Sequence, residues 1–275
     1  ELVGVTDVRP EAVQDRSKQW SVPGYPDLTG LIEGGKPEAV CLFVPHDARL
    51  GLVQTAAATG VHVFLEKPIA ADVEEGRKIT RVCSETGVTL MVGQNGLFHP
   101  AFERVVEFVK AGRIGTPLFA RASSIGRIAF RDWDFRVSRS KTGGGCWVDA
   151  GGHLVYCLRE ILGEVTGTQG IFARLSRREM EGEDFASVNL TYAGGALANL
   201  VVSYGLKLPG YANDWPRGYE QGFEIFGERG AIRYLISPEP VVSWFSEDGK
   251  VMPQDWQCWL SHRPALPYEE SFFRT

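Results

Sequence analysis

The first 118 residues alternate short apolar runs with longer amphipathic stretches, a pattern typical of βαβ units on a parallel sheet. Runs rich in β-branched residues predict strands at 2–5, 39–44, 61–65 and 89–92. The intervening stretches predict helices at 11–19, 48–59, 73–86 and 101–111. The strands are apolar on consecutive positions, so we expect both faces of the sheet to be covered, although periodicity alone does not separate such strands from buried helices.

Two glycines stand where helices of this region should end. Gly60 and Gly87 each follow an amphipathic stretch and precede an apolar run. Glycine accepts the left-handed backbone conformation that terminates many helices. We therefore expect two successive helix-to-strand connections with the same construction.

The pattern changes after Pro117. A strand is predicted over 118–123, followed by an irregular stretch rich in arginine and aromatic residues over 127–141. The next helix ends at Gly163, and its apolar stripe consists of Leu154, Leu158, Ile161 and Leu162. Alternating segments then predict a large, mainly antiparallel sheet, at 187–192, 196–204, 223–226, 231–236 and 241–245.

The length favours two domains, because 275 residues exceed the usual size of one. We place the boundary at the change of pattern, which divides the chain into 1–118 and 119–275. One large domain is the alternative. A composition of 44% hydrophobic and 23% charged residues is that of an ordinary globular protein.

Charge and cysteine usage limit the function classes. A net charge of -5 supplies no basic surplus for nucleic acid or an anionic membrane surface, and no apolar run is long enough to span a bilayer. The five cysteines are scattered without a CxxC pair, which argues against a disulfide framework or a metal site. We expect a protein of the cytoplasm, although the sequence begins inside a strand-like run, so an export signal before Glu1 stays open.

Asp7 follows the first predicted strand, where a nucleotide-binding α/β fold places an acid against the ribose hydroxyls. A turn or a helix cap is the alternative role for this residue. The glycine-rich phosphate loop that should precede the strand is absent from the sequence. Without the strand that comes before this loop, the central position of a doubly wound sheet would be empty and the neighbouring strands would be unpaired. We therefore expect the natural chain to extend beyond this sequence, before Glu1 and also at the other end.

Glu66-Lys67-Pro68 comes directly after the strand predicted at 61–65. The carboxyl ends of parallel strands are where open α/β sheets bind ligands, so Lys67 is a candidate functional cation. An exposed ion pair before a helix is the alternative.

The segment from Gly143 to His153 combines glycines that permit close backbone approach with an acid and an imidazole. Asp149 and His153 are four residues apart at the predicted start of a helix, and one turn would place them on the same face. A carboxylate near an imidazole fixes its tautomer and raises its basicity, which suits a general base. A capping aspartate and a packed histidine are the alternative.

Together these motifs resemble the Gfo/Idh/MocA oxidoreductase family over nearly the whole chain. The resemblance rests on Val44-Pro45, on 60–68, on Gly93-Gln94-Asn95 with Phe98-His99-Pro100, on 143–153, and on 223–227 with Gly230. It implies a doubly wound Rossmann domain over 1–118 and, over 119–275, an α/β domain for substrate binding and oligomerisation, with a substrate cleft between them.

The resemblance also implies an activity and a set of site residues. The protein would be an NAD(P)-dependent dehydrogenase or reductase acting on a sugar, a cyclic polyol or a relative, with NAD as the expected cofactor and NADP as the alternative. Lys67 would hold the reacting oxygen, and Asp149 and His153 would serve proton transfer. The cofactor side would include Lys67 together with Asp7, Arg9, Pro45, Glu66, Pro68 and Asn95. A homodimer or homotetramer would form through the second domain, whose segments 196–202 and 241–245 present apolar faces.

Three parts of the sequence depart from the family pattern. Tyr156 stands where the family often has an aspartate, and Gly96-Leu97 replaces a usual arginine near Asn95. The stretch from Val44 to Arg49 replaces a common Thr-Pro followed by Asn and His. Two other functions fit the same fold: cleavage of glycosides through transient oxidation, and ligand sensing without turnover. The joint presence of Lys67, Asp149 and His153 argues against the sensor.

Overall fold

The computed structural model describes residues 1–130, 134–208, 218–237 and 241–246. Parts of the predicted irregular stretch and of the predicted second domain, including 247–275, therefore lie outside the described residues. The chain divides into two compact units. The first comprises 1–93 with 141–143, and the second comprises 94–140 together with the residues from 144 onward.

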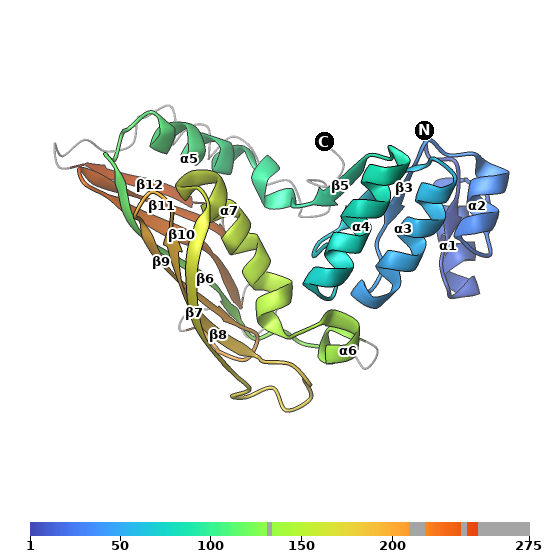
Figure 1. Ribbon diagram of the computed structural model, residues 1–275. Coiled ribbons are helices and arrows are strands. Elements are labelled where there is room, and N and C mark those ends of the chain that lie inside the picture. The colour runs from blue at the N-terminus through green and yellow to red at the C-terminus, as the bar shows by residue number, and fades with distance from the viewer. Residues whose placement is uncertain (131–133, 209–217, 238–240, 247–275) are drawn as a thin grey trace. The chain divides into compact units, whose positions relative to one another are not determined.

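The first unit contains five short parallel strands (Figure 1). β1 (Val5–Thr6) pairs with β2 (Gly24–Tyr25), and β3 (Ala39–Leu42), β4 (His62–Glu66) and β5 (Leu90–Gly93) form a second sheet in that order. Among the described residues, no ladder joins β1 to β3. The predicted parallel, Rossmann-like sheet is confirmed.

Helices connect these strands. They are α1 (Pro10–Trp20), α2 (Leu28–Gly35), the short 3-10 helix η1 (His46–Ala48), α3 (Arg49–Ala58) and α4 (Val73–Thr86). Gly60 and Gly87 both adopt positive φ, at 76° and 70°, which confirms the predicted terminations. α2 was not predicted because three of its eight residues are glycines. It is held instead by the Asp27 carboxylate, which accepts a hydrogen bond from Gly30 N–H at 2.7 Å, and by burial of Leu28 and Leu31.

The second unit is built on a seven-stranded mixed sheet, ordered β12-β11-β10-β6-β9-β8-β7. Its strands are β6 (Pro117–Gly126), β7 (Val165–Ala173), β8 (Phe185–Tyr192), β9 (Leu197–Ser203), β10 (Tyr219–Gly227), β11 (Gly230–Ser237) and β12 (Val241–Ser246). Every neighbouring pair is antiparallel except β6 and β9. The mainly antiparallel sheet was predicted, but β7 was not. This strand lies at the sheet edge with mostly exposed side chains, so it lacks the apolar alternation of a half-buried strand.

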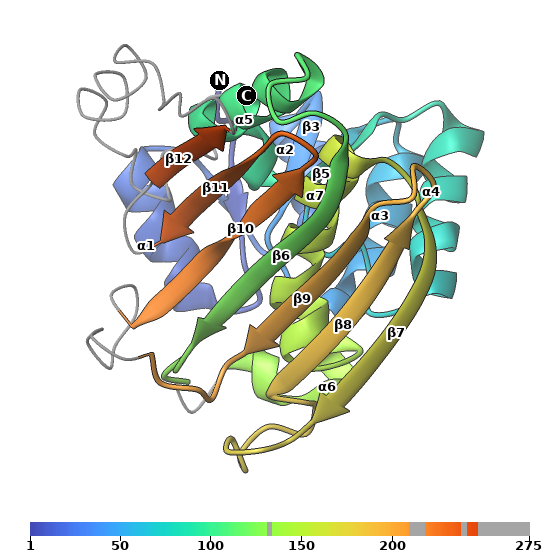
Figure 2. The same cartoon turned by 90° about the vertical axis from the view of Figure 1, so that its left-hand side faces the viewer.

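One face of this sheet is covered by α5 (Pro100–Lys110) and α7 (Gly152–Leu162), and its other face points toward the viewer in Figure 2. Leu154 and Leu158 of the predicted apolar stripe are buried. Phe102 of α5 packs against Phe223 and Tyr234 of the sheet, with ring centroids 6.2 and 6.1 Å apart. The packing of α5 explains why the units divide at Gly93, whereas the boundary we placed at 118 follows the change of sequence pattern.

Short helices complete the second unit: η2 (Asn95–Phe98), η3 (Phe135–Val137), α6 (Arg139–Thr142) and η4 (Trp147–Gly151). The last two residues of α6 belong to the first unit. His46 Nδ1 lies 3.0 Å from the backbone oxygen of Thr142 there. The five residues of η4 wind as a π-helix and run directly into α7.

Candidate functional site

The first group of predicted residues lies at the carboxyl ends of β3 and β4. Buried Val63 and Leu65 fix β4 in the sheet, and the strand ends at Glu66, whose carboxylate accepts the Lys67 N–H. Lys67 and Pro68 follow, joined by a cis peptide bond. Because Leu42 of β3 is paired with Leu65 of β4, the carboxyl ends of these two strands lie side by side. The structure thus brings Pro45 together with the Glu66-Lys67-Pro68 segment.

Arg49 ties these two strand ends together. The side chain is only 2% exposed. Its Nε and Nη2 donate to the Val44 oxygen at 3.1 and 3.0 Å, and Nη2 also donates to the Lys67 oxygen at 3.3 Å. Nη1 donates to the Glu66 oxygen. The backbone that carries Lys67 is therefore held by a buried, charged donor.

Sequence reasoning named Arg49 as a departure from the family pattern but gave it no role. A signal was present in the helix periodicity. Arg49 lies four and seven residues before Val53 and Ala56, both fully buried on α3. An arginine on the apolar face of a helix requires buried acceptors, and here they are main-chain oxygens.

Asp7 and Arg9 form a local pair just after β1. Asp7 Oδ1 accepts Arg9 N–H at 2.9 Å and Arg9 Nε–H at 3.2 Å. Burial acts to raise the pKa of Asp7, but the hydrogen bonds and positive charge of Arg9 lower it below its usual value. The carboxylate is thus ionised at neutral pH. By accepting the Arg9 N–H it also stabilises a local turn, which was the alternative role predicted for Asp7.

These residues fit a nicotinamide dinucleotide in chemistry. An ionised carboxylate after β1 is a good acceptor for ribose hydroxyls. Pro45 follows the end of β3 and Glu66 is the last residue of β4, at the edge where such sheets bind ligands. Asn95, also predicted for the cofactor, is placed in the second unit, at the start of η2.

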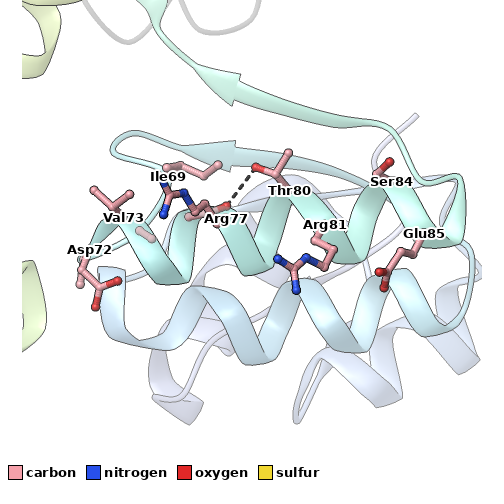
Figure 3. A pocket seen from close by; sticks show the side chains of 11 residues that line it. Ile69, Asp72, Val73, Arg77, Thr80, Arg81, Ser84 and Glu85 are labelled. Atoms are coloured by element: carbon pink, nitrogen blue, oxygen red, sulfur yellow. Dashed lines mark hydrogen bonds between the residues drawn. The ribbon is translucent and has the colours of Figure 1, made fainter.

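A cavity of about 960 Å³ lies along α4 in the first unit (Figure 3). It begins at Ile69, directly after Pro68, and continues over Arg77 and Arg81 of the helix. Arg77 is paired with Glu74 at 2.8 Å, and the Asp72 carboxylate caps the helix by accepting Glu75 N–H. The lining of this cavity includes none of the residues predicted for catalysis or cofactor binding.

In the second unit, the glycine-rich segment is packed tightly against Glu183. A Cβ on Gly145 would lie 1.9 Å from the Glu183 main-chain oxygen, so only glycine fits there. The Glu183 carboxylate accepts the N–H groups of Gly145 at 3.0 Å and Trp147 at 3.1 Å. It thereby satisfies free donors at the start of the helical segment. The close backbone approach was predicted from the glycines, whereas Glu183 was not found.

Asp149 lies on the π-helix η4, and His153 lies in the first turn of α7. The helical start at this place was therefore predicted correctly. The prediction of one regular α-helical turn from Asp149 to His153 differs from the structure, because Asp149 lies in the wider π-helical turn of η4. Both residues are half-buried. The Asp149 carboxylate accepts a hydrogen bond from Tyr204 Oη at 2.5 Å. The coupling of Asp149 to His153 stays a prediction.

An arginine and an aromatic ring lie near Asp149. Arg136 is held by two side-chain hydrogen bonds to Asp134, at 2.9 and 2.6 Å, and its guanidinium lies 5.4 Å from the centre of the Phe130 ring. Hydrogen bonding to Asp134 raises the pKa of Arg136, and the Asp149 carboxylate adds to the rise. Sequence reasoning missed Tyr204, Arg136 and Asp134, because they are brought to Asp149 from separate segments.

No helix in the described ranges is long and apolar enough to cross a membrane. The same residues contain no group of three or more histidine, cysteine, aspartate or glutamate side chains arranged to hold a metal ion.

Comparison with known proteins matches both parts of the chain to one family. A model described as "Oxidoreductase family, NAD-binding Rossmann fold" matches residues 1–94, and one described as "GFO/IDH/MocA C-terminal domain" matches residues 102–233. The two matches follow the two compact units.

Two curated relatives are named as dehydrogenases of a polyol and of a small carbohydrate. Inositol 2-dehydrogenase of Rhizobium meliloti is 31% identical over 236 residues, which cover 84% of this chain and 67% of the relative. D-apiose dehydrogenase of Paraburkholderia graminis is 26% identical over 205 residues, which cover 74% of this chain and 54% of the relative. The chain thus spans between about half and two thirds of the length of these relatives.

Solved structures share the fold. The WlbA dehydrogenase from Bordetella pertussis, in complex with NADH and UDP-GlcNAcA, has a TM-score of 0.79 at 23% identity. The match covers 99% of this chain and 74% of that one.

Proposed function

Because the chain belongs to the Gfo/Idh/MocA oxidoreductase family, we propose that it transfers a hydride between a nicotinamide cofactor and a hydroxyl or carbonyl carbon of a sugar or cyclic polyol. One observation carries this proposal: Lys67 follows the carboxyl end of β4, on a backbone that buried Arg49 holds beside the end of β3. A lysine on a backbone held at that edge of a parallel sheet suits an enzyme that must orient a polar substrate.

The nicotinamide supplies the hydride chemistry, and the residues of this chain supply binding and orientation. On the cofactor side we place Asp7, Arg9, Pro45, Glu66, Lys67, Pro68 and Asn95. The ionised Asp7 carboxylate favours NAD, because it accepts ribose hydroxyls and repels a 2'-phosphate. Arg9 is the reason to keep NADP as an alternative, since its guanidinium could turn from Asp7 to that phosphate.

Three residues take the chemical roles. Lys67 orients the reacting oxygen, His153 takes the hydroxyl proton, and Asp149 supports the imidazole. The division follows from titration, because histidine exchanges a proton near neutrality whereas an ordinary lysine stays charged. Tyr204 supports this assignment, since it occupies one oxygen of the Asp149 carboxylate with a hydrogen bond.

The test is a dehydrogenation screen of the full-length protein with sugars, inositols and glycosides, using both nicotinamides. Reduced nicotinamide formed on a simple sugar or polyol, and lost in Lys67→Ala, is the expected result. Release of an aglycone without net reduced nicotinamide would instead show the glycoside-cleaving reaction. Cofactor binding without turnover on any substrate would favour a sensor.

We also propose a homodimer or homotetramer formed through the sheet face that α5 and α7 leave open. A row of apolar side chains crosses five strands on that face, because each member is paired with the next: Leu197, Phe119, Phe226, Ala231 and Phe245. The four largest are between 37% and 62% exposed, and Phe119 stacks on Phe226 with centroids 6.1 Å apart. Exposed apolar area of this kind favours a protein partner.

A polar row runs beside it on the same face. Arg121 and Arg233 both pair with Glu224, and the Asn199 amide donates to the Asn189 side chain at 2.8 Å. Such a row gives a self-complementary interface a defined register. A monomer at micromolar concentration by sedimentation would contradict the proposed assembly.

For location we propose the cytoplasm. The four described cysteines, Cys41, Cys83, Cys146 and Cys157, are free. Free thiols are typical of a reducing compartment. Fractionation of the native cells would test this.

A further inference from the structure

Tyr204 is held rigidly beside Asp149. The side chain is 3% exposed, and its ring packs edge-on against Phe130 with centroids 6.2 Å apart. Its backbone is fixed on both sides, because Tyr204 N–H donates to the Asp184 oxygen at 2.9 Å and Ile128 N–H donates to the Tyr204 oxygen at 3.2 Å. The phenol oxygen therefore has one position, 2.5 Å from Asp149 Oδ2.

The direction of this hydrogen bond is set by charge. Burial raises the pKa of Tyr204 well above its usual value, and the Asp149 carboxylate raises it further. The phenol is consequently protonated at neutral pH, so it is the donor and the carboxylate is the acceptor. A short hydrogen bond to a carboxylate stabilises the ionised form.

Other ionisable groups act on the same carboxylate. Arg136 contributes a positive charge, opposed by its partner Asp134, and the Cys146 thiol lies near enough to be influenced. His153 is on the following turn of the chain. Tyr204 donates a hydrogen bond directly to the Asp149 carboxylate.

We propose that Tyr204 is a positioning residue for the reaction: its hydroxyl holds the Asp149 carboxylate in one orientation and in the ionised state. This rests on the proposed function. In the oxidation direction the O–H and C–H bonds of the substrate would break and a C=O bond would form. The proton would go to the His153 imidazole, and a bound nicotinamide would accept the hydride. With Asp149 held ionised, the proton stays on the imidazole rather than passing to the carboxylate.

Removing the Tyr204 hydroxyl should raise the pKa of the Asp149 carboxyl group. A carboxylate that loses a donor to its charged form has a higher pKa, by roughly 1–2 units for a charge-assisted hydrogen bond. The Asp149 titration should therefore move upward by about that amount in Tyr204→Phe. The acid limb of kcat/KM should move in the same direction, because a carboxylate without this donor stabilises the protonated His153 imidazole more strongly. The loss of activity would be large below the shifted limb and small above it. A merely structural role would lower the profile equally at all pH values.

The chain offers a matched control in Tyr192. This tyrosine is also buried in the same unit, at 1% exposed, but its hydroxyl has no hydrogen-bond partner among the described residues. Tyr192→Phe removes the same atom from a comparable environment. We expect no displacement of the acid limb in this variant.

The experiment combines pH profiles of kcat/KM for the wild type and both variants with an NMR titration of the Asp149 carboxyl carbon in the full-length protein, assigned with Asp149→Asn. An upward shift of both the titration and the acid limb in Tyr204→Phe alone is the expected result. An Asp149 titration equal to that of the wild type would overturn the proposal. If no variant and no wild-type protein turns over, the proposed function fails, but the NMR titration still decides the role of Tyr204.

Discussion

Lys67 and Asp149 are held in place by different means, although we assign both to one reaction. The backbone of Lys67 is held through main-chain oxygens, by a guanidinium seven residues beyond the end of β3. Asp149 is held through its side chain, by Tyr204 from the end of another strand. A residue that is positioned by its backbone can be found from its place after a strand. A residue positioned through its side chain needs the neighbours that only the folded sheet supplies.

The largest expected effect comes from removing His153 or Lys67, and the kinetics should distinguish the roles of these two residues. His153→Ala should lower kcat by about 100-fold to 10,000-fold, the usual cost of removing a general base, while cofactor binding is retained. Lys67→Ala should lose a comparable factor and also raise the substrate KM, because it orients the substrate. Steady-state kinetics with a separate nicotinamide-binding assay measure both effects, and Lys78→Ala, at an exposed position of α4, is the control. Wild-type turnover of His153→Ala between pH 6 and 9 would transfer the proton role to Lys67, with Tyr156 as a partner.

The second effect concerns the backbone support. Arg49→Met should lower the free energy of unfolding by roughly 2–4 kcal/mol, because buried carbonyl oxygens at both strand ends lose a charged donor. Arg49→Lys keeps the charge but not the forked geometry, so it should recover only part of the loss. Chemical denaturation measures the difference. Equal stability of Arg49→Met and the wild type would show that these strand ends need no such donor.

The third effect tests the open face of the second unit. Phe119→Glu places a charge in the middle of the apolar row, so the assembly should dissociate at least tenfold more readily while each subunit stays folded. Sedimentation over a concentration series measures this. Val73→Glu changes an exposed apolar residue of the first unit and should leave the assembly intact.

The smallest effect belongs to the cofactor side. Asp7→Asn should reduce the preference for NAD over NADP by about tenfold, since the ribose acceptor loses its charge and a 2'-phosphate is no longer repelled. Asp15→Asn on exposed α1 is the control. The ratio of kcat/KM for the two cofactors is the measurement. A wild-type protein that already prefers NADP would show that Arg9, rather than Asp7, controls the choice.

From the sequence alone we predicted the parallel sheet, the two terminating glycines, the antiparallel region and the places of Lys67 and Asp149 along the chain. These are local properties, because apolar periodicity and glycine conformation are written in consecutive residues. β2 and β7 were missed for the same reason, since a two-residue strand and an exposed edge strand carry almost no periodic signal.

Only the tertiary structure decided which side chains support the predicted ones. Tyr204 lies 55 residues from Asp149 along the chain. Glu183 accepts the N–H of Gly145, which lies 38 residues before it. The wide π-helical turn beneath Asp149 likewise has no simple sequence signature. Hydrogen bonds between distant segments depend on how strands pair and where loops return. That is a property of the whole sheet, which no local pattern of residues contains.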